Sequence, residues 1–511
     1  MGAARPASGA DEPIVLRWST YVGGPSSEAA QAVAAGPDFV TIGGYSFGDG
    51  FPTSADAAQA LPPGRTDAVA TTFRSEGRDL GYSSYLGGSD QDAVHDVAAD
   101  DTGAVYLVGE AHSLDFPTTP GVVQPVSGGG QDAFIVKLAS DGSGVEWATY
   151  LGGTDYELAY GADVGPDGSV YVTGRTVSAD FPTTPDALRR ELLGRSDVYV
   201  ARLSSDGTRL EYSTLFGGSN STQRPTSGEA GRAIAVDQTG AAYIAGVTDS
   251  SDLPTRSALP PAGRPLGVTF GGGLGDAFAA KIVPGEAEPA WSGYLGGSFS
   301  DSAGTISVDA SGVAYVGGGT DSPDFPVFLA RQPVHGGIGG FDGWLTRIER
   351  GGAGMGWSTF LGGNGRDAIA DVEINDDGTL WLAGGTSTAT FPTTPDALQA
   401  VNGGGASDGF LLRLASDGTA VLYGTFLGGS GWDDISGIAR VADNIVIAAG
   451  YTDSNNFPVT FDSFQPASAG NGDAFVASIG PPLPPMPEPT CRPPGRPSER
   501  PPHGSPPGKP C

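Results

Sequence analysis

Seven carboxylates that recur after Gly-Gly pairs are the residues whose type and spacing could do chemistry. In "ATYLGGTDYELA", which begins at Ala148, Glu157 lies four residues beyond the second glycine. Six units share this spacing, and in the remaining unit the distance is eleven residues. The seven acids are Glu28, Asp92, Glu157, Glu229, Asp301, Asp367 and Asp433. Carboxylate oxygens in such number would suit a hard cation such as calcium, and a carboxylate pair can cleave a glycosidic bond.

Three further markers repeat in step and define the unit that positions each acid. The residue two places before each Gly-Gly recurs at intervals of 64, 65, 65, 79, 66 and 66 residues, as Tyr21, Tyr85, Tyr150, Leu215, Tyr294, Phe360 and Phe426. A Phe-Pro or Leu-Pro pair begins at Phe51, Phe116, Phe181, Leu253, Phe325, Phe391 and Phe457. An aspartate opens an apolar stretch at Asp67, Asp132, Asp197, Asp276, Asp342, Asp408 and Asp473. This period indicates a repeat architecture of seven units.

Each unit contains four strand-like stretches and no helical periodicity. In the unit from Asp92 they are "AVHDVAAD", "AVYLVGEA", "DAFIVKLAS" and "VEWATYLGG". Two of the connections carry the turn signals "DTG" and "DG". The pattern predicts an all-β fold, a seven-bladed β-propeller of four-stranded antiparallel blades, because a closed ring leaves no long sheet edge exposed.

The two ends of the chain test this prediction. The last unit stops at "DAFVASIG" (Asp473 to Gly480) without a fourth strand, and the chain begins with an unattached strand from Ile14. Pairing the two would complete the last blade and close the ring. The expected organisation is therefore a flexible N-terminus over residues 1–13, the propeller over 14–480 and a disordered Pro-rich tail over 481–511.

The repeats resemble the SBBP family, the seven-bladed β-propeller repeats of bacterial proteins. The residues that carry the resemblance are "YLGG", "DTGAVYLVG", "DFPTTP" and "DAFIVKLASDG" followed by "WATYLGG". It covers roughly Ile14 to Gly480. The resemblance implies the propeller fold and a secreted or cell-surface setting, and it implies no catalytic residues. The first unit is the poorest copy, and the fourth lacks the Tyr and Phe anchors.

Repetition favours a structural role for the seven acids. If the strand after each acid is innermost in its blade, the carboxylates form a ring near one mouth of the axial channel. Such a ring could hold a cation or a cationic ligand, and calcium stays an open option. A feature copied into every blade more readily belongs to the scaffold, with each carboxylate accepting backbone N–H bonds in its own turn. The aspartates that open the third strands are expected to cap backbone donors in the same way.

Other catalytic patterns find no support. "GYSFG" and "GASDG" match G-x-S-x-G, but a nucleophile elbow needs a strand-to-helix turn that the sequence does not offer. His95 and His112 share one unit, yet no third metal ligand stands beside them. We therefore predict no catalytic residue, no metal site and no cofactor.

Departures from the repeat are the better guide to a ligand. The fourth unit contains two insertions of about seven residues, in "SNSTQRPTSG" and in "ALPPAGRPLGVTFGGGLG". They precede the first strand and join the second strand to the third, so both are expected on one face of the ring. Arg224 and Arg264, with Glu229, are thus the candidate ligand-binding residues, although surface loops also tolerate insertions without any function.

Composition limits the partners. A formal charge of −31 argues against nucleic-acid binding, and no apolar run could span a bilayer. The N-terminus lacks the apolar core of a signal peptide, so the protein is cytoplasmic, a mature form or an incomplete gene product. The only cysteines, Cys491 and Cys511, lie in a tail with 14 prolines in 31 residues, and they could form a disulfide or cross-link an otherwise monomeric protein.

The sequence favours a non-enzymatic propeller that binds a protein or glycan ligand. The alternative is a propeller enzyme, such as a polysaccharide lyase or hydrolase, that uses carboxylates on the loop-rich face. The direction in which the seven acids point distinguishes the two, because catalytic carboxylates must face open space.

Overall fold

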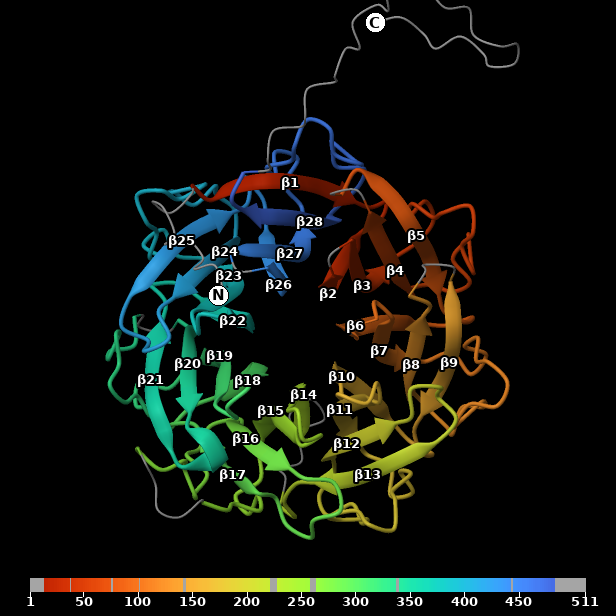
Figure 1. Ribbon diagram of the computed structural model, residues 1–511, viewed down its shortest axis with the longest axis vertical. Helices are drawn as coiled ribbons and strands as arrows, with labels where there is room; N and C mark the ends of the chain where they lie inside the picture. Colours follow the sequence, from red (N-terminus) through yellow and green to blue (C-terminus); the bar gives the residue numbers. More distant parts are fainter. Residues whose placement is uncertain are drawn as a thin grey trace, which may run out of the picture.

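The computed structural model describes residues 13–482, except 37, 75–76, 101, 141–143, 221–227, 258–262, 337–339 and 443. Seven four-stranded antiparallel sheets surround a central axis, as Figure 1 shows. Apart from a single 3-10 turn over Arg350–Gly352, the described elements are all strands. The predicted seven-bladed propeller is confirmed. No helix in this described part of the chain has the length and apolar character needed to span a membrane.

Within each blade, the strands run outward in sequence order. The innermost strands are β2 (Glu28–Gly36), β6 (Asp92–Ala99), β10 (Glu157–Val164), β14 (Ala230–Val236), β18 (Asp301–Val308), β22 (Asp367–Ile374) and β26 (Asp433–Ala442). The second strands are β3 (Phe39–Ser46), β7 (Val105–Ala111), β11 (Val170–Thr176), β15 (Ala242–Thr248), β19 (Ala314–Thr320), β23 (Leu380–Thr386) and β27 (Ile445–Thr452). The third strands are β4 (Asp67–Arg74), β8 (Asp132–Leu138), β12 (Asp197–Leu203), β16 (Asp276–Ile282), β20 (Asp342–Ile348), β24 (Asp408–Leu414) and β28 (Asp473–Gly480). The outer strands are β5 (Asp79–Leu86), β9 (Val145–Leu151), β13 (Leu210–Phe216), β17 (Trp291–Leu295), β21 (Met355–Leu361), β25 (Val421–Leu427) and β1 (Val15–Val22).

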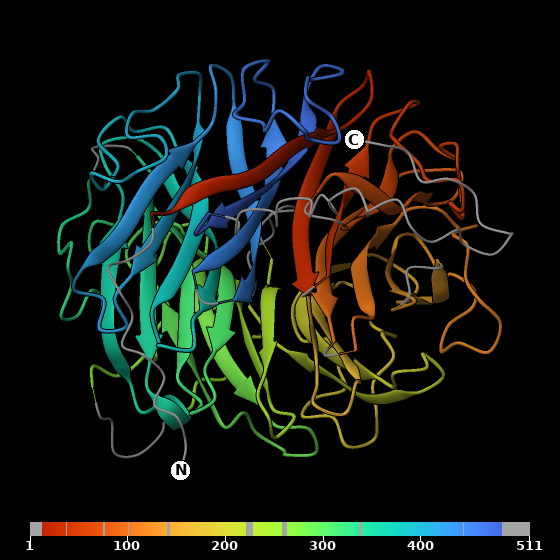
Figure 2. The same cartoon turned by 45° about the horizontal axis from the view of Figure 1, so that its top comes forward.

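Strand β1 closes the ring, as the chain ends predicted. It pairs antiparallel with β28 from Val15 opposite Gly480 to Val22 opposite Ala474, and it forms the outer strand of the seventh blade. Figure 2 shows this red strand lying across the blue strands of the chain's last blade. The N-terminal strand thereby covers the edge of β28 that would otherwise stay unpaired.

In six of the seven blades, the repeated aromatic residue of the outer strand contacts the loop between the second and third strands; the third blade has Leu215 at this position. The Tyr150 hydroxyl donates to the Ser113 carbonyl at 2.7 Å and accepts from the Phe116 N–H at 2.8 Å. Phe116 in turn stacks on Phe134, with ring centroids 4.6 Å apart. The aromatic residue before Gly-Gly and the Phe-Pro pair are therefore two halves of one contact, which explains why they repeat in step.

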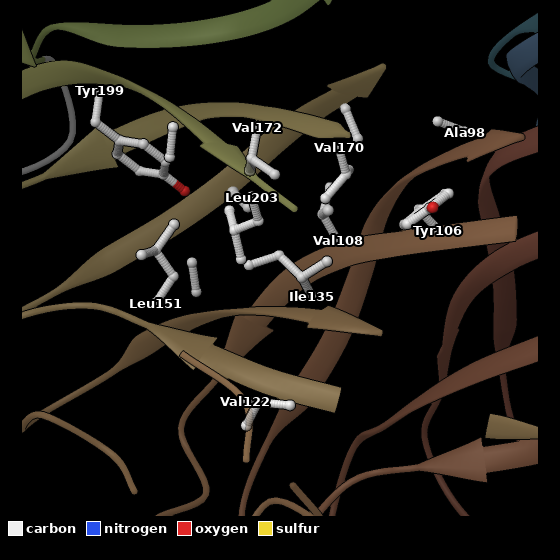
Figure 3. Close-up of a cluster of buried hydrophobic side chains, with 14 of the residues drawn as sticks. Ala98, Tyr106, Val108, Val122, Ile135, Leu151, Val170, Val172, Tyr199 and Leu203 are labelled. Atoms are coloured by element: carbon white, nitrogen blue, oxygen red, sulfur yellow. The ribbon is translucent and has the colours of Figure 1, made fainter. Parts of the chain in front are cut away.

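Apolar side chains of neighbouring blades pack together in the body of the ring. Figure 3 shows one such cluster, in which Val108 and Ile135 of the second blade meet Val170 and Leu203 of the third. These side chains are almost completely buried. Burial of this kind between every pair of blades favours one closed ring over separate sheets.

Candidate functional site

The seven repeated acids lie at the joints where the outer strand of one blade leads into the innermost strand of the next. Each side chain is at most 2% exposed. Each carboxylate accepts a hydrogen bond of 2.7–2.9 Å from the N–H of the second glycine of its Gly-Gly pair. A Ser or Thr hydroxyl at or just beyond the end of the second strand also donates to it, as Thr176 does to Glu157 at 2.6 Å. All seven acids therefore face backbone turns.

A second buried carboxylate faces each of these acids across the first glycine of the pair. It belongs to the aspartate that opens the third strand, which caps a loop N–H as predicted; Asp132 accepts from Gly128 at 2.8 Å. A Cβ on Gly152 would lie 1.8 Å from Asp132 Oδ1 and 2.6 Å from Glu157 Oε2. The glycine is thus required because the two carboxylates leave no room for a side chain.

Burial raises the pKa values of these paired carboxyls. Removal from water is the largest cause, and the charge of the facing acid adds to it in several joints. The pKa of Glu229 rises to about 8, that of Asp276 to about 7 and that of Asp367 to about 6. The chemistry this geometry supports is hydrogen bonding within the joint, because both carboxylates of a pair lack open space for a substrate.

Of the three residues proposed from the fourth unit, the structure describes Glu229 and Arg264. Arg224 lies outside the described residues. Glu229 is buried, and both of its oxygens accept from the Gly218 N–H. The backbone of Arg264 forms an isolated antiparallel β-bridge with Met355 at the start of β21, and its Nη1 donates to the Val327 carbonyl at 3.0 Å. Outer strands begin at the end of the ring opposite the joints, so Arg264 lies on the outer flank of the molecule, away from the face where Glu229 lies.

The axial channel is the clearest concave site. A cavity of about 420 Å³ lies between the innermost strands of all seven blades. Each of these strands contains a β-bulge three residues after its repeated acid, where the register against the second strand shifts. The bulged residues all line the cavity, and we call them the bulge ring: Gln31, His95, Tyr160, Arg232, Gly304, Ala370 and Ser436.

The bulge ring is chemically asymmetric although the blades are alike. Over the second to fourth blades, the rings of His95 and Tyr160 lie with centroids 5.4 Å apart, and the Arg232 guanidinium lies 4.1 Å from the Tyr160 centroid. The next three positions are Gly304, Ala370 and Ser436, which leave that side of the channel open. The cavity therefore has a wall of large polar and aromatic side chains facing a wall of small ones.

Acids deeper in the channel join neighbouring blades. Asp96 accepts from the Ala162 N–H and Asp163 from the Val236 N–H, each hydrogen bond joining one blade to the next. Burial is the first cause that raises the pKa of Asp96 to about 7 and that of Asp163 to about 6. Glu373 lines the same cavity, and burial followed by the charge of Asp371 raises its pKa to about 8. Asp96 and Asp163 thus use some of their acceptor capacity on backbone N–H groups, and all three acids make the channel interior acidic.

The two histidines of the second blade lie on either side of one glutamate. His95 Nε2 is 3.7 Å from Glu110 Oε1, and His112 Nε2 is 4.0 Å from Glu110 Oε2. Gln131 donates to the same Oε2 at 2.6 Å. Within the described ranges, no group of three or more His, Cys, Asp or Glu side chains is arranged to hold a metal ion. Glu110 is the partner of both histidines, and sequence reasoning missed it.

The bulge ring was also missed, although the repeat contains the signal. The third residue after each acid differs in every unit, while the markers around it stay nearly constant. A position that varies inside a strict repeat is not constrained by the packing contacts that determine the residue types around it. The bulge shifts the register of the innermost strand, and this shift points the variable residues toward the channel. The position of a bulge cannot be read from the sequence.

The blades and the channel define the class of this protein, a seven-bladed β-propeller. No protein-family model matches the chain, and no curated protein matches it. Among solved structures, it is similar to the WD40 beta-propeller domain of Doa1 (10% identity, TM-score 0.41, 90% of this chain and 96% of that one). It is also similar to a protein of unknown function from Dyadobacter fermentans (11%, 0.40, 92% and 99%) and to an ulvan lyase (9%, 0.42, 91% and 96%). A WD40 domain and a lyase stand at the same level of likeness, so neither carries an argument about activity.

Proposed function

We propose that this propeller is a non-enzymatic binding module whose ligand enters the axial channel from the face that carries the joints. The observation that carries the proposal is the bulge ring, a set of seven channel-lining positions that differ between otherwise repeated blades. A symmetric scaffold that serves only packing has no need of seven different side chains there. A concave cavity of a few hundred Å³ with a few convergent polar groups is the usual form of a ligand site.

Exposed aromatic side chains around the same face support this proposal. Tyr156, Phe299 and Trp432 each lie in a joint next to a repeated acid, and Phe47 follows β3 at the same end of its blade. They are 50–57% exposed. Large aromatic side chains that are exposed to solvent at several joints offer flat apolar surfaces to a glycan or to a peptide.

The geometry of the repeated acids supports binding over catalysis. The carboxylates on which a lyase or hydrolase would depend are buried and bonded to backbone N–H groups in all seven joints. An enzyme therefore stays the second candidate, favoured only by the raised pKa values of Asp96 and Glu373, which line the cavity.

The bacterial SBBP type of the repeats and an exported or surface location belong to this proposal as well. They are supported by the repeated "YLGG" and "DFPTTP" residues alone. Fractionation of the source cells, with detection of the intact protein in each fraction, tests the location. Recovery in the cytoplasm would contradict it.

The binding proposal is tested with a glycan screen and a pull-down on the full chain. We expect ligands to be lost in the triple variant His95→Ala, Tyr160→Ala, Arg232→Ala and retained in Arg264→Ala, which changes the outer flank. Hits are then incubated with the wild-type protein and followed by chromatography. Breakdown of a hit would favour the enzyme, and binding that survives the triple variant but not Arg264→Ala would place the site on the flank.

A further inference from the structure

Two arginines of the third and fourth blades lie near each other at the joint end of the ring, and one of them, Arg232, lines the channel. Arg232 belongs to the bulge ring, and Arg175 is the penultimate residue of β11, opposite Leu158 at the joint end of its blade. Both guanidiniums act electrostatically on each other, and Tyr160 lies within reach of both. They form a cationic pair in a chain of formal charge −31.

Arg175 is held at this place by its surroundings. Its guanidinium lies beside Gly228, the residue before Glu229, where a Cβ would meet Ser196 Oγ at 2.1 Å and Arg175 Nη2 at 3.1 Å. Arg175 Nε is buried and has no hydrogen-bond partner among the described residues. Burial lowers the pKa of Arg175, and the charge of Arg232 lowers it further while Tyr160 opposes the shift. A buried guanidinium N–H without an acceptor is costly, and an acceptor supplied from outside would remove that cost.

Among the described residues, the two arginines have no carboxylate as a direct ion-pair partner. In the described part of the chain, Arg175 and Arg232 form no ion pair within 4.0 Å, although other arginines do so, such as Arg202 with Asp167. Asp249 acts on Arg175 only at longer range. Asp and Glu number 58 and Lys and Arg 27, so two neighbouring arginines are a local excess of positive charge in an acidic chain.

We propose that Arg175 and Arg232 bind the carboxylate of a terminal acidic sugar, a proposal that rests on the channel mouth being the ligand site. A planar guanidinium matches a carboxylate with two parallel hydrogen bonds. Tyr156, 57% exposed beside the same joint, offers a stacking surface for the next sugar ring. The open side at Gly304 and Ala370 leaves space for the sugar in the cavity of about 420 Å³.

The charge of the whole molecule limits how many acidic groups the ligand carries. A formal charge of −31 repels polyanions at long range, while a single carboxylate at the end of a saccharide meets mainly the local pair. A sugar chain with one terminal uronic acid is therefore favoured over a polyuronate or an acidic peptide.

The test compares two disaccharides that differ in one group, a glucuronic-acid-terminated disaccharide and its glucose-terminated counterpart. Binding to the full-length protein is measured by calorimetric titration, with free glucuronate, poly-glutamate and polygalacturonate as further probes. The variants are Arg175→Gln, Arg232→Gln and Arg232→Lys. The matched control is Arg366→Gln, which removes a joint-face arginine that lies over Phe341 in another sector, 5.8 Å from the ring centroid. Circular dichroism and melting curves confirm that each variant is folded.

We expect the acidic disaccharide to bind at least tenfold more tightly than the neutral one, and each Gln variant to remove about that factor. Arg232→Lys should lose most of the preference because it keeps the charge but not the planar fork. Arg366→Gln should bind like the wild type. Equal binding of both disaccharides that is lost in Tyr160→Ala would overturn the arginine proposal and leave the channel site standing. Tighter binding of poly-glutamate or polygalacturonate would overturn the choice of a single terminal sugar. Acidic binding that is unaffected by either Gln variant would refute both the pair and its place at the mouth.

Discussion

Replacing Glu229 by glutamine should stabilise the protein at alkaline pH and leave its stability nearly unchanged at acidic pH. Glu229 accepts from the Gly218 N–H and from Thr248 Oγ1 at 2.7 Å, and it faces Asp197 across Gly217. Asp197 Oδ2 is paired with Arg189 at 2.8 Å, whereas its Oδ1 has no hydrogen-bond partner in the described structure. A protonated Glu229 can donate to that oxygen. Glutamine keeps one acceptor and supplies a permanent N–H donor in its place.

The size of the effect follows from the pKa of Glu229. Burial first, and the charge of Asp197 in addition, raise it from 4.5 to about 8. A group whose pKa is raised in the folded state binds more protons folded than unfolded, so its contribution is fully present below the unfolded value and is lost as the pH rises through the folded one. A shift of this size corresponds to a ceiling of about 5 kcal/mol between pH 4.5 and 8. The neutral amide does not titrate and avoids this loss.

Thermal unfolding across a pH series measures the difference. The melting temperature of Glu229→Gln should match that of the wild type near pH 5 and exceed it by several degrees near pH 8.5, since the entropy of unfolding grows with chain length and gives about 1 °C per kcal/mol for a ring of this size. Glu286→Gln is the matched control, because Glu286 is exposed in the loop after β16. A difference between Glu229→Gln and wild type that is the same at both pH values would refute the protonated joint.

Three further changes follow from the same contacts. Gly152→Ala would place a Cβ 1.8 Å from Asp132 Oδ1, so we expect a strongly lowered melting temperature or no soluble protein, while Gly304→Ala, whose Cβ meets nothing closer than 3.5 Å, should melt like the wild type. Tyr150→Phe leaves the buried N–H of Phe116 unpaired and should cost about 1–3 kcal/mol in the free energy of unfolding; an unchanged melting temperature would contradict this. Deletion of residues 1–22 removes β1 and should expose the edge of β28, giving aggregates in size-exclusion chromatography, whereas deletion of residues 1–12 should leave a monodisperse ring.

The sequence was sufficient for the fold because the fold is made of local markers. The period, the four strand-like stretches and the unmatched strand at each end each specify an element or its place, so the ring and its closure by β1 could be predicted. The role of the aspartates that open the third strands could be predicted for a similar reason. Aspartate is unfavourable in a strand, so its repeated presence there indicates that it caps backbone N–H groups. The sequence could not predict that Asp132 and Glu157 face each other, because they come from neighbouring blades and meet only when the ring has formed.

For the ligand residues proposed from the insertions, the structure describes Arg264 and Glu229 and places them at different parts of the fourth blade. An insertion marks a place where the chain tolerates extra length, but it does not determine the direction in which the extra chain runs. The described residues of the loop between β15 and β16 contact outer strands, as Gly267 does with Tyr294, and in another blade the Thr119 N–H donates to the Ala148 carbonyl in the same way. Arg264 was therefore carried to Val327 on the flank, away from Glu229.

In this propeller, one set of residues builds the fold and a different set lines the channel. This division indicates which residues are available for function. Residues such as Glu157 and Gly152 must recur in every blade, because each joint has to be built in the same way and a change in either would disturb the carboxyl pair. A bulged residue lies outside the carboxyl pair of its joint and lines the channel, so its side chain is not fixed by the way the joint is built. Arg232 could thus appear in one blade and Gly304 in the next without any cost to the ring. Selection for a ligand can act on the bulge ring independently of selection for the fold, which is why we base the proposed site on the asymmetry of those seven positions and not on the symmetry of the seven acids.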